Sequence, residues 1–495
     1  MTRTVEIREM MQTSGVGFGT SGARGLVSAM TDAVCCAYTL GFLQALRRRG
    51  EIALGSPVGI AGDRRSSTGR IMQAVAHGVR QAGHSIVHAG RVPSSAIALV
   101  GLERKIPTLM VTGSHIPDDR NGIKFNKTTG EILKEDEAAI VSEVVRLEDD
   151  FDAQGQLRLG TSTNLPDADP SASSRYVARW LEAFPNGFLR GKRIVVFGHS
   201  AVGRDLLVEI LDGLGAETIR VGWSEQFIPV DTEAIRPEDV TSAREWAKEY
   251  RPFAIVSTDG DSDRPLVSDE SGKWLRGDVL GVLTARFLKA SAVVTPISSN
   301  TVVERSGAFG CVERTRIGSP YVIAAMNEAV AKGHQPVVGY EANGGFLTAT
   351  PVNVPGGGRL SPLPTRDPVI VMLSVFAAAV QAGCSVSALE SALPARATAS
   401  GRIKEFPNEI SRARLTALQA GGLPAFNELF AQLVGEFSAI DLTDGIRGTT
   451  KTDEIIHLRA SGNAPELRCY AEADNTARAD ALSAQALELV KRAWL

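Results

Sequence analysis

The fold is decided by residues 58–90, VGIAGDRRSSTGRIMQAVAHGVRQAGHSIVHAG, where a polar turn and a helical stretch separate two apolar strands. Related patterns follow at residues 194–222 (IVVFGHSAVGRDLLVEILDGLGAETIRVG) and, in shorter form, at residues 293–318 (VVTPISSNTVVERSGAFGCVERTRIG). Strand–helix–strand alternation implies parallel pairing in an α/β layer. The copies lie roughly 100–140 residues apart, which predicts three similar α/β domains in a row. A chance likeness is the alternative, because such units resemble one another generally.

The last part of the chain has a different pattern. Helical stretches come after about residue 390, followed by IIHLRASGNAPELRCYAEA (455–473), which together predict a smaller α+β domain. The segment GTSTNLPDADPSASS (160–174) is rich in turn formers and predicts the first linker. At about 100–200 residues per domain, the length suggests three or four domains. We expect them to span residues 1–165, 166–275, 276–388 and 389–495.

Composition limits the classes of partner. The formal net charge of -3 gives no reason to expect nucleic acid or an anionic membrane surface. Five cysteines without CxxC spacing favour a reduced, cytoplasmic setting. The first residues lack the apolar region of a signal peptide. The longest apolar run, VIVMLSVFAAAV from Val369, is too short to span a bilayer and predicts a buried core helix.

The strongest chemical motif is AIVSTDGDSDRPLV (254–267), in which an apolar strand leads into Asp259, Asp261 and Asp263. Three carboxylates on one tight loop repel one another, and a hard divalent cation such as Mg²⁺ would relieve that repulsion. An EF-hand is a poor match, because Arg264 stands where that loop needs glycine. A solvated acidic turn without metal is the other alternative. Arg264 is placed either to bind a phosphate or to pair with its aspartate neighbours.

A second motif is VTGSHIPDDRNGIKF (111–125), which follows a predicted strand at residues 108–111. Ligands of open α/β sheets gather at the carboxyl ends of strands, so we expect Ser114 to be exposed and able to react. A turn-capping serine and a surface Lys124 are the alternatives. His115 is adjacent, but sequence neighbours rarely form a Ser-His pair, and the second glycine of a hydrolase GxSxG elbow is missing.

Three further segments have compositions suited to anions or sugars. GFGTSGARG (17–25) combines glycines with Arg24, and HLRASGNAPELR (457–468) suits phosphate, although a plain turn would have a similar composition. VVGYEANGGF (337–346) offers an acid and an amide to sugar hydroxyls on a loop that we expect to be exposed, with an Asn-Gly hairpin turn as the alternative. DRRSS (63–67) is interpreted as an internal brace of the first domain.

The chain resembles the α-D-phosphohexomutase superfamily in five motifs, which occur in order between residues 18 and 468: FGTSGARG, TGSHIP, DGDSDR, GYEANGG and RASGNAPELR. The resemblance is closest to bacterial phosphomannomutases and phosphoglucomutases. It implies three similar α/β domains and a C-terminal α+β domain related to the TATA-binding-protein-like class, packed around one central cleft. Each domain would contribute one loop to that cleft.

The resemblance also implies roles for individual residues. Ser114 would carry the phosphoryl group and, with Asp259, Asp261 and Asp263, hold one Mg²⁺ per chain. Lys124 matches a proposed general base, and His115 accompanies the serine. Substrate would be bound by arginines of the cleft, by the sugar loop and by the C-terminal phosphate loop: Arg24, Arg264, Glu341, Asn343, Arg459, Ser461, Gly462 and Asn463.

The implied activity interconverts hexose 1-phosphate and hexose 6-phosphate, with mannose phosphates preferred, through a hexose 1,6-bisphosphate that also serves as activator. Phosphoglucomutase or phosphoglucosamine mutase activity, a metal-dependent sugar phosphatase and a non-catalytic binder are the alternatives. The expected partner is a hexose phosphate, and the enzyme would be a monomer or homodimer. Ser262, Gly113, Ile116 and Asn343 depart from the usual residues of relatives. If position 262 requires positive φ, its serine costs roughly 1 kcal/mol.

Overall fold

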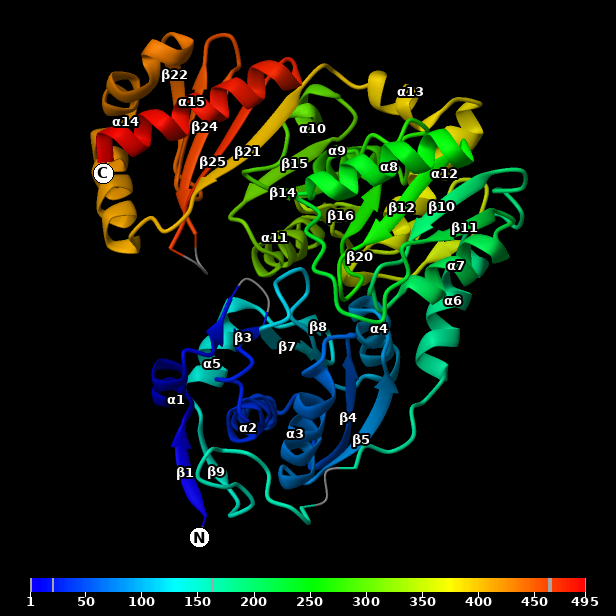
Figure 1. The fold of residues 1–495 in the computed structure, drawn as a ribbon, viewed down its shortest axis with the longest axis vertical. Coiled ribbons are helices and arrows are strands. Elements are labelled where there is room, and N and C mark those ends of the chain that lie inside the picture. Colours follow the sequence, from blue (N-terminus) through cyan, green and yellow to red (C-terminus); the bar gives the residue numbers. More distant parts are fainter. Residues whose placement is uncertain (1, 20–21, 162–163, 462–464, 495) are drawn as a thin grey trace.

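Three sheets of the computed structural model share one strand order around a central parallel strand (Figure 1). The structure describes residues 2–19, 22–161, 164–461 and 465–494. The central strands are β4 (Gly55–Gly62), β10 (Arg193–Phe197) and β14 (Ala292–Pro296). Each pairs in parallel on one side with β5 (His84–Gly90), β11 (Glu217–Val221) or β15 (Cys311–Thr315). On the other side the parallel partners are β6 (Thr108–Val111), β12 (Ala254–Thr258) and β16 (Val337–Tyr340).

The strand–helix–strand prediction is therefore confirmed in all three copies. The connecting helices are α3 (Thr68–Gln81), α7 (Arg204–Gly213) and the four-residue α10 (Val302–Arg305), which makes the third copy the shortest, as expected. In α3 the buried apolar residues Ile71, Met72, Val75 and Val79 recur on one face, which packs against the first sheet.

A fourth strand returns antiparallel beside the third parallel strand in each sheet. These strands are β7 (Arg120–Lys127), β13 (Pro265–Val267) and β17 (Phe346–Thr348). The three turns that precede them hold Ser114, the three aspartates and the Glu341–Asn343 segment, respectively. Equivalent positions in three similar sheets thus present the three predicted motifs, and the packing of the sheets brings the turns together.

The remaining strands of this part extend the sheets or form small pairs. They are β1 (Arg3–Glu6), β2 (Gly17–Phe18), β3 (Ala23–Leu26), β8 (Gly130–Glu131), β9 (Val144–Leu147), β18 (Val352–Asn353), β19 (Arg359–Leu360) and β20 (Leu363–Asp367). The covering helices are α1 (Ile7–Ser14), α2 (Asp32–Arg48), α4 (Ser94–Arg104), α5 (Lys134–Val141), α6 (Ser171–Ala183), α8 (Pro237–Tyr250), α9 (Gly277–Phe287), α11 (Ser319–Ala331), α12 (Val369–Ala382) and α13 (Val386–Ser391).

The C-terminal part is an α+β unit, as predicted. Its antiparallel sheet has the order β21 (Ala397–Ile403), β25 (Leu467–Ala473), β24 (Ile455–Ala460), β23 (Ile446–Thr450) and β22 (Phe437–Asp441). Two helical segments pack on it: α14 (Asn408–Val434), which is kinked where the backbone of Gly422 is not helical, and α15 (Thr476–Trp494). The predicted fold class, three similar α/β units followed by an α+β unit, is confirmed.

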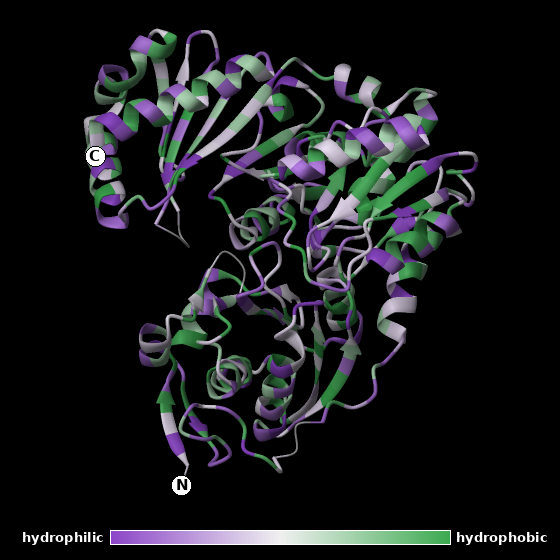
Figure 2. Ribbon diagram, in the orientation of Figure 1, coloured by the Kyte–Doolittle hydropathy of each residue, from purple (hydrophilic) through white to green (hydrophobic). Residues whose placement is uncertain are grey.

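The largest core is shared between neighbouring units. It includes Trp180 of α6 and the predicted core helix α12, whose residues from Val369 to Ala377 are buried. Figure 2 shows hydrophobic residues along strands such as β10 and β12, with a mixture of residue types on the outer helices. No helix in the described ranges is long and apolar enough to cross a membrane.

Candidate active site

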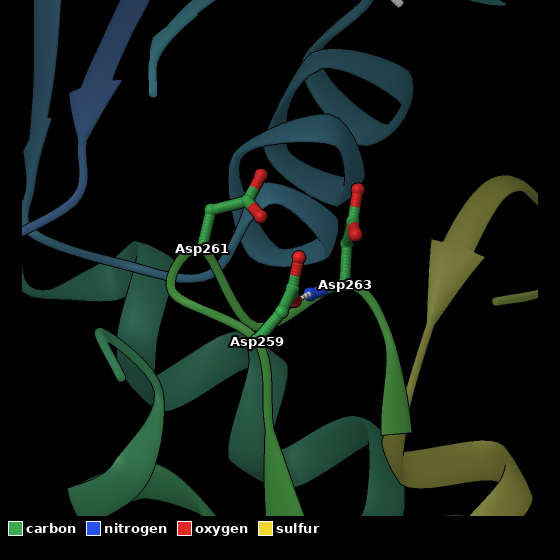
Figure 3. Close-up of side chains that lie close together, drawn as sticks. All are labelled: Asp259, Asp261 and Asp263. Carbon is green, nitrogen blue, oxygen red and sulfur yellow. Dashed lines mark hydrogen bonds between the residues drawn. The ribbon is translucent and has the colours of Figure 1, made fainter. Parts of the chain in front are cut away.

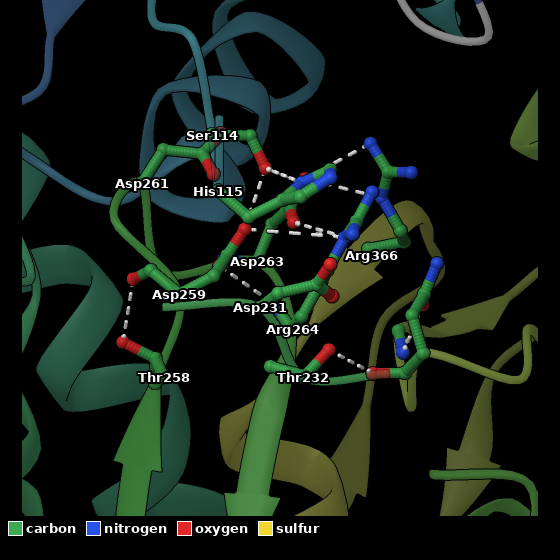
Figure 4. A network of polar contacts seen from close by, with 12 residues as sticks. Ser114, His115, Asp231, Thr232, Thr258, Asp259, Asp261, Asp263, Arg264 and Arg366 are labelled. Carbon is green, nitrogen blue, oxygen red and sulfur yellow. Dashed lines mark hydrogen bonds and ion pairs between the residues drawn. The ribbon is translucent and has the colours of Figure 1, made fainter. Parts of the chain in front are cut away.

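Ser114 lies in the turn between β6 and β7 with a left-handed φ of 56°. Its backbone N–H donates to Thr112 Oγ1 at 2.7 Å, and its hydroxyl donates to Asp259 Oδ2 at 2.6 Å (Figure 4). Backbone strain of this kind costs of order 1 kcal/mol and persists only where surrounding contacts determine the conformation. The expectation of an exposed serine is wrong, because Ser114 is 0% exposed. The loop of the second sheet at residues 259–263, which we call the metal loop, lies against it.

The aspartates of the second sheet form one compact group (Figure 3). Asp259, Asp261 and Asp263 are buried and each offers an oxygen within 4.8 Å of the others. Burial, and then the charges of Asp261 and Asp263, raise the pKa of Asp259 well above its ordinary value. A cation between the three groups would remove this repulsion, since hard divalent ions bind carboxylate oxygens.

Among the described residues, Asp261 and Asp263 each have one carboxylate oxygen that is hydrogen-bonded and one that is not. Lys124 Nζ donates to Asp261 Oδ2 and to Asp263 Oδ2, at 2.5 Å each. Ser94 Oγ also donates to Asp261 Oδ2, at 2.6 Å. Within the described part of the chain, Oδ1 of each of these aspartates has no hydrogen-bond donor although it is buried. Two unpartnered buried carboxylate oxygens beside Asp259 Oδ2 fit one divalent cation.

Lys124 is therefore not a surface lysine. Its ammonium is buried and forms ion pairs with Asp261 and Asp263, which lie more than a hundred positions further along the chain. Burial alone would raise the pKa of Asp261, but the charge and hydrogen bond of Lys124 hold it below its ordinary value. The sequence indicated a lysine of the site but not these contacts.

Cationic side chains surround the serine and the aspartates. Arg264 Nε lies 3.9 Å from Asp259 Oδ2 and 3.8 Å from Asp263 Oδ1, so it does pair with its neighbours. Burial, and then the charge of Arg264, lower the pKa of Arg24 to about 10. Arg24 Nε, Arg24 Nη2 and Arg264 Nε are buried and find no acceptor among the residues described. Buried guanidinium N–H groups that lack a hydrogen-bond acceptor are suited to bind the oxygens of an anion such as phosphate.

His115 faces the serine hydroxyl, with Nδ1 3.4 Å from Ser114 Oγ. Ser114 and His115 therefore do contact each other although they are neighbours in sequence, but the distance between Oγ and Nδ1 is longer than in a strong hydrogen bond. Burial, and then the charges of Arg264 and Arg24, hold the pKa of His115 well below its ordinary value. The imidazole is consequently neutral near pH 7.

The predicted sugar loop is a tight hairpin turn between β16 and β17. Glu341 N donates to Gly345 O, and Gly345 N donates to the side-chain oxygen of Asn343. Glu341 is only 4% exposed, so the expectation of an exposed loop is wrong. The segment is a hairpin, as the alternative supposed, but its turn has Ala342 and Asn343 at the centre, because Gly344 N donates to Glu341 O. The carboxylate of Glu341 still forms an ion pair with Arg366 at the site.

Arg366, on β20, is a site residue that the sequence did not indicate. Its guanidinium binds Asp263 Oδ2 at 3.0 Å (Figure 4). It also binds Glu341 Oε2 at 3.1 Å, so it joins the metal loop to the sugar loop. Arg366 belongs to no recognisable motif, and its partner Asp263 is 103 positions away. Ser94, at the start of α4, was missed for the same reason.

The predicted phosphate loop connects β24 and β25. Arg459 lies near the end of β24, with Nε 3.5 Å from Asp444 Oδ1, and Ser461 is buried next to it. Gly462 and Asn463 lie outside the described residues. Arg459 is thus the second-last residue of β24, and Ser461 is the first residue after the strand.

The backbone of Ser262 in the metal loop shows whether this position requires a positive φ. It has a left-handed φ of 54°, so the position does favour glycine. Its hydroxyl accepts from Gly203 N at 2.9 Å, at the start of α7, and lies 2.9 Å from Thr258 Oγ1. The serine therefore offsets its backbone strain with two buried hydrogen bonds.

We expect Ser262→Ala to destabilise the protein by about 2 kcal/mol, because the buried Gly203 N–H loses its acceptor while the strain remains. Ser262→Gly should cost only about 1 kcal/mol, since glycine relieves the strain. Urea unfolding followed by tryptophan fluorescence measures both. A glycine variant more stable than the native protein would show that the hydrogen bonds of the hydroxyl contribute less than the roughly 1 kcal/mol of backbone strain that glycine relieves.

Comparison with known proteins agrees with this geometry. Family models described as "Phosphoglucomutase/phosphomannomutase" match as alpha/beta/alpha domain I (residues 15–150), alpha/beta/alpha domain III (276–397) and C-terminal domain (411–489). A phosphomannomutase of Sinorhizobium fredii (strain NBRC 101917 / NGR234) is 42% identical over 476 residues, covering 96% of this chain and 99% of that protein. A phosphomannomutase of Salmonella muenchen is 41% identical, covering 94% of each.

The fold is shared with a solved phosphoglucomutase/phosphomannomutase family protein from Burkholderia thailandensis, at a TM-score of 0.74 and 18% identity, covering 96% of this chain and 97% of that one. Sequence identity above 40% over nearly the full length, together with three matching domain models, identifies the family. The chain belongs to the phosphoglucomutase/phosphomannomutase family.

Proposed function

We propose that this chain interconverts hexose 1-phosphate and hexose 6-phosphate, with mannose phosphates as the preferred substrates. The observation that supports this best is the 2.6 Å hydrogen bond from Ser114 Oγ to Asp259, one of three buried carboxylates suited to a divalent cation. A serine hydroxyl in that position is suited to hold a phosphoryl group beside a metal. The preference for mannose follows from the relatives at 42% and 41% identity, both phosphomannomutases.

In the proposed reaction, Ser114 carries a phosphoryl group and transfers it to the free hydroxyl of a hexose phosphate. The bond between phosphorus and serine oxygen breaks, a bond to the sugar oxygen forms, and the sugar hydroxyl gives up its proton. Mg²⁺ held by Asp259, Asp261 and Asp263 would neutralise charge on the transferring group. The resulting hexose 1,6-bisphosphate turns around and returns its other phosphoryl group to Ser114.

The surrounding residues have distinct proposed tasks. The N–H groups of Arg24 and Arg264 that lack a hydrogen-bond acceptor bind oxygens of the transferring phosphoryl group. Glu341 and Asn343 bind sugar hydroxyls. The phosphate that stays in place is bound by the C-terminal loop, in both orientations of the sugar, through Arg459, Ser461, Gly462 and Asn463.

Either Lys124 or His115 accepts the proton of the attacking hydroxyl. His115 is neutral near pH 7 and close to Ser114 Oγ, but a proton on it would lie among arginines. Lys124 pairs with both carboxylates as an ammonium, so it must first lose a proton before it can act as the base. The two carboxylates then hold its position and stabilise the charge that it regains on proton transfer. We therefore propose Lys124 as the proton acceptor.

The test follows ³¹P resonances of mannose 1-phosphate and, separately, glucose 1-phosphate, with Mg²⁺ and a trace of the matching 1,6-bisphosphate. We expect the 6-phosphate to appear in both reactions, with the higher kcat/KM for mannose 1-phosphate. Steady release of inorganic phosphate without isomer would instead indicate a sugar phosphatase. A failure to form isomer or phosphate from either sugar would favour a non-catalytic binder.

The setting of the enzyme is also proposed. We place it in the cytoplasm, since its five cysteines are free. We also propose that it is a monomer or homodimer. We further propose domains at residues 1–165, 166–275, 276–388 and 389–495, each contributing one loop to the site.

A further inference from the structure

Arg65 lies directly beneath the turn that holds Ser114, with 0% of its side chain exposed. Its Nη2 donates to the carbonyls of Ser114 and Ile116, at 2.8 and 2.5 Å. Its Nη1 donates to the carbonyls of Pro117 and Arg120, at 2.6 and 2.9 Å. One planar guanidinium therefore satisfies four carbonyls of a single turn, a geometry that no other side chain can provide.

The guanidinium of Arg65 also forms an ion pair with the buried carboxylate of Asp63. Asp63 Oδ2 lies 3.2 Å from Arg65 Nε and accepts a hydrogen bond from Thr112 Oγ1 at 2.7 Å. Thr112 Oγ1 in turn accepts the backbone N–H of Ser114. Both the N–H and the C=O of Ser114 are thus fixed by one network, which keeps the serine in its left-handed conformation.

The other face of the guanidinium contacts the second α/β unit. Arg65 Cζ lies 4.0 Å from the ring centroid of Phe227, a cation–π arrangement. Phe227 also packs on the metal loop, because a Cβ added to Gly260 would lie 2.9 Å from its Cε2 atom. Phe227 therefore contacts both the brace beneath the serine and the loop that holds the aspartates.

This packing explains Gly113, one of the departures from the usual residues of relatives. A Cβ on Gly113 would lie 2.6 Å from Arg65 Cζ, so any side chain there would displace the guanidinium. The guanidinium occupies a slot between the Gly113 backbone and the Phe227 ring. Gly113, Arg65 and Phe227 form one unit, which we call the serine brace.

We infer that Arg65 is a positioning residue, which sets the distance between the Ser114 hydroxyl and the metal loop through the serine brace. The inference rests on the proposed role of Ser114 as phosphoryl carrier. Arg65 bonds backbone carbonyls and not the reacting atoms, so its effect is on geometry. Misplacing a reacting group by about 1 Å costs about 100-fold in rate.

The decisive variant is Arg65→Lys, whose ammonium keeps the charge but cannot satisfy four carbonyls in one plane. The measurement is the rate at which hexose 1,6-bisphosphate phosphorylates Ser114 in the full chain with Mg²⁺, followed by intact mass. We expect this rate and kcat to fall about 100-fold, with KM for the hexose phosphate unchanged. Phe227→Leu, which removes only the aromatic face, should lower both about fivefold.

Arg64→Lys is the matched control. Arg64 is the next residue back in the chain and also reaches the second unit, through ion pairs with Asp205 and Glu225 at 3.3 and 3.6 Å. Its side chain bonds Asp205, whereas the bonds to the carbonyls of the Ser114 turn come from Arg65, so the Arg64 variant should phosphorylate Ser114 at the wild-type rate.

The outcomes separate the inference from the proposed function. If wild-type protein takes up no phosphoryl group, the proposed function fails and the inference falls with it. If wild type is phosphorylated and Arg65→Lys matches its rate, the inference alone is overturned, even where thermal stability falls. If Arg65→Lys is insoluble, Phe227→Leu decides: a wild-type rate overturns the inference, and a fivefold loss with unchanged KM supports it.

Discussion

Ser114→Ala lowers kcat for hexose phosphate isomerisation by at least about 10⁴-fold, the scale seen when a nucleophile is removed from an enzyme. Among the residues that the structure describes, Ser114 is the one whose hydroxyl donates to Asp259 Oδ2. Alanine retains the backbone contacts to Thr112 and Arg65, so the turn keeps its shape. The loss is measured with mannose 1-phosphate and trace bisphosphate, and intact mass should show a phosphoryl group on wild type alone.

A buried serine nearby provides the control for this variant. Ser95, in helix α4, is 0% exposed and its hydroxyl donates to Tyr176 at 3.0 Å, away from the aspartates. Ser95→Ala should retain wild-type kcat and accept a phosphoryl group normally. Retention of more than about 1% of wild-type activity by Ser114→Ala would mean that another group carries the phosphoryl, because such a residual rate is far above that expected without a nucleophile.

The parts of the site that could be predicted are those encoded within a few residues. Three aspartates at alternate positions after an apolar strand already specify a crowded acidic turn, and the structure gathers them as expected. The strand–helix–strand repeats could be recognised in the sequence because the spacing of apolar residues that marks a strand or a helix extends over only a few residues. Equivalent turns in the repeats then explain why Ser114 and Glu341 approach the same place.

The parts that could not be predicted depend on packing between units. Ser114 looked exposed because its own sheet leaves it at a strand end, yet the second sheet covers it. Arg366 and Ser94 reach the aspartates from 103 and 167 positions away, and neither belongs to a pattern with a chemical meaning of its own. Arg65 was interpreted as an internal brace, which its contacts support, but its contact with Phe227 needed the relative placement of two units.

The second large effect is expected for Asp261→Asn. The amide keeps the shape of the carboxylate but removes a charge that the cation requires, and its NH₂ group can be turned toward the position of the unpartnered Oδ1 atom. Losing an outer partner of a metal ligand costs about 10–100-fold in affinity, so losing a ligand should cost at least about 100-fold. Calorimetric titration of the full chain with Mg²⁺ measures this without reference to turnover.

Three variants with graded effects on Mg²⁺ affinity test whether the cation binds at the aspartate turn. Ser94→Ala removes only the 2.6 Å hydrogen bond to Asp261 Oδ2, so Mg²⁺ affinity should fall about 10-fold, between Asp261→Asn and wild type. Asp205→Asn, which removes an exposed carboxylate paired with Arg64, should leave the affinity unchanged. Asp261→Asn and Asp205→Asn each remove one carboxylate charge near the contact between the same two units, so a general loss of charge would affect these two variants alike. Wild-type affinity in Asp261→Asn would exclude the aspartate turn as the metal site, whereas the order Asp261→Asn, Ser94→Ala, Asp205→Asn follows only if the cation binds there.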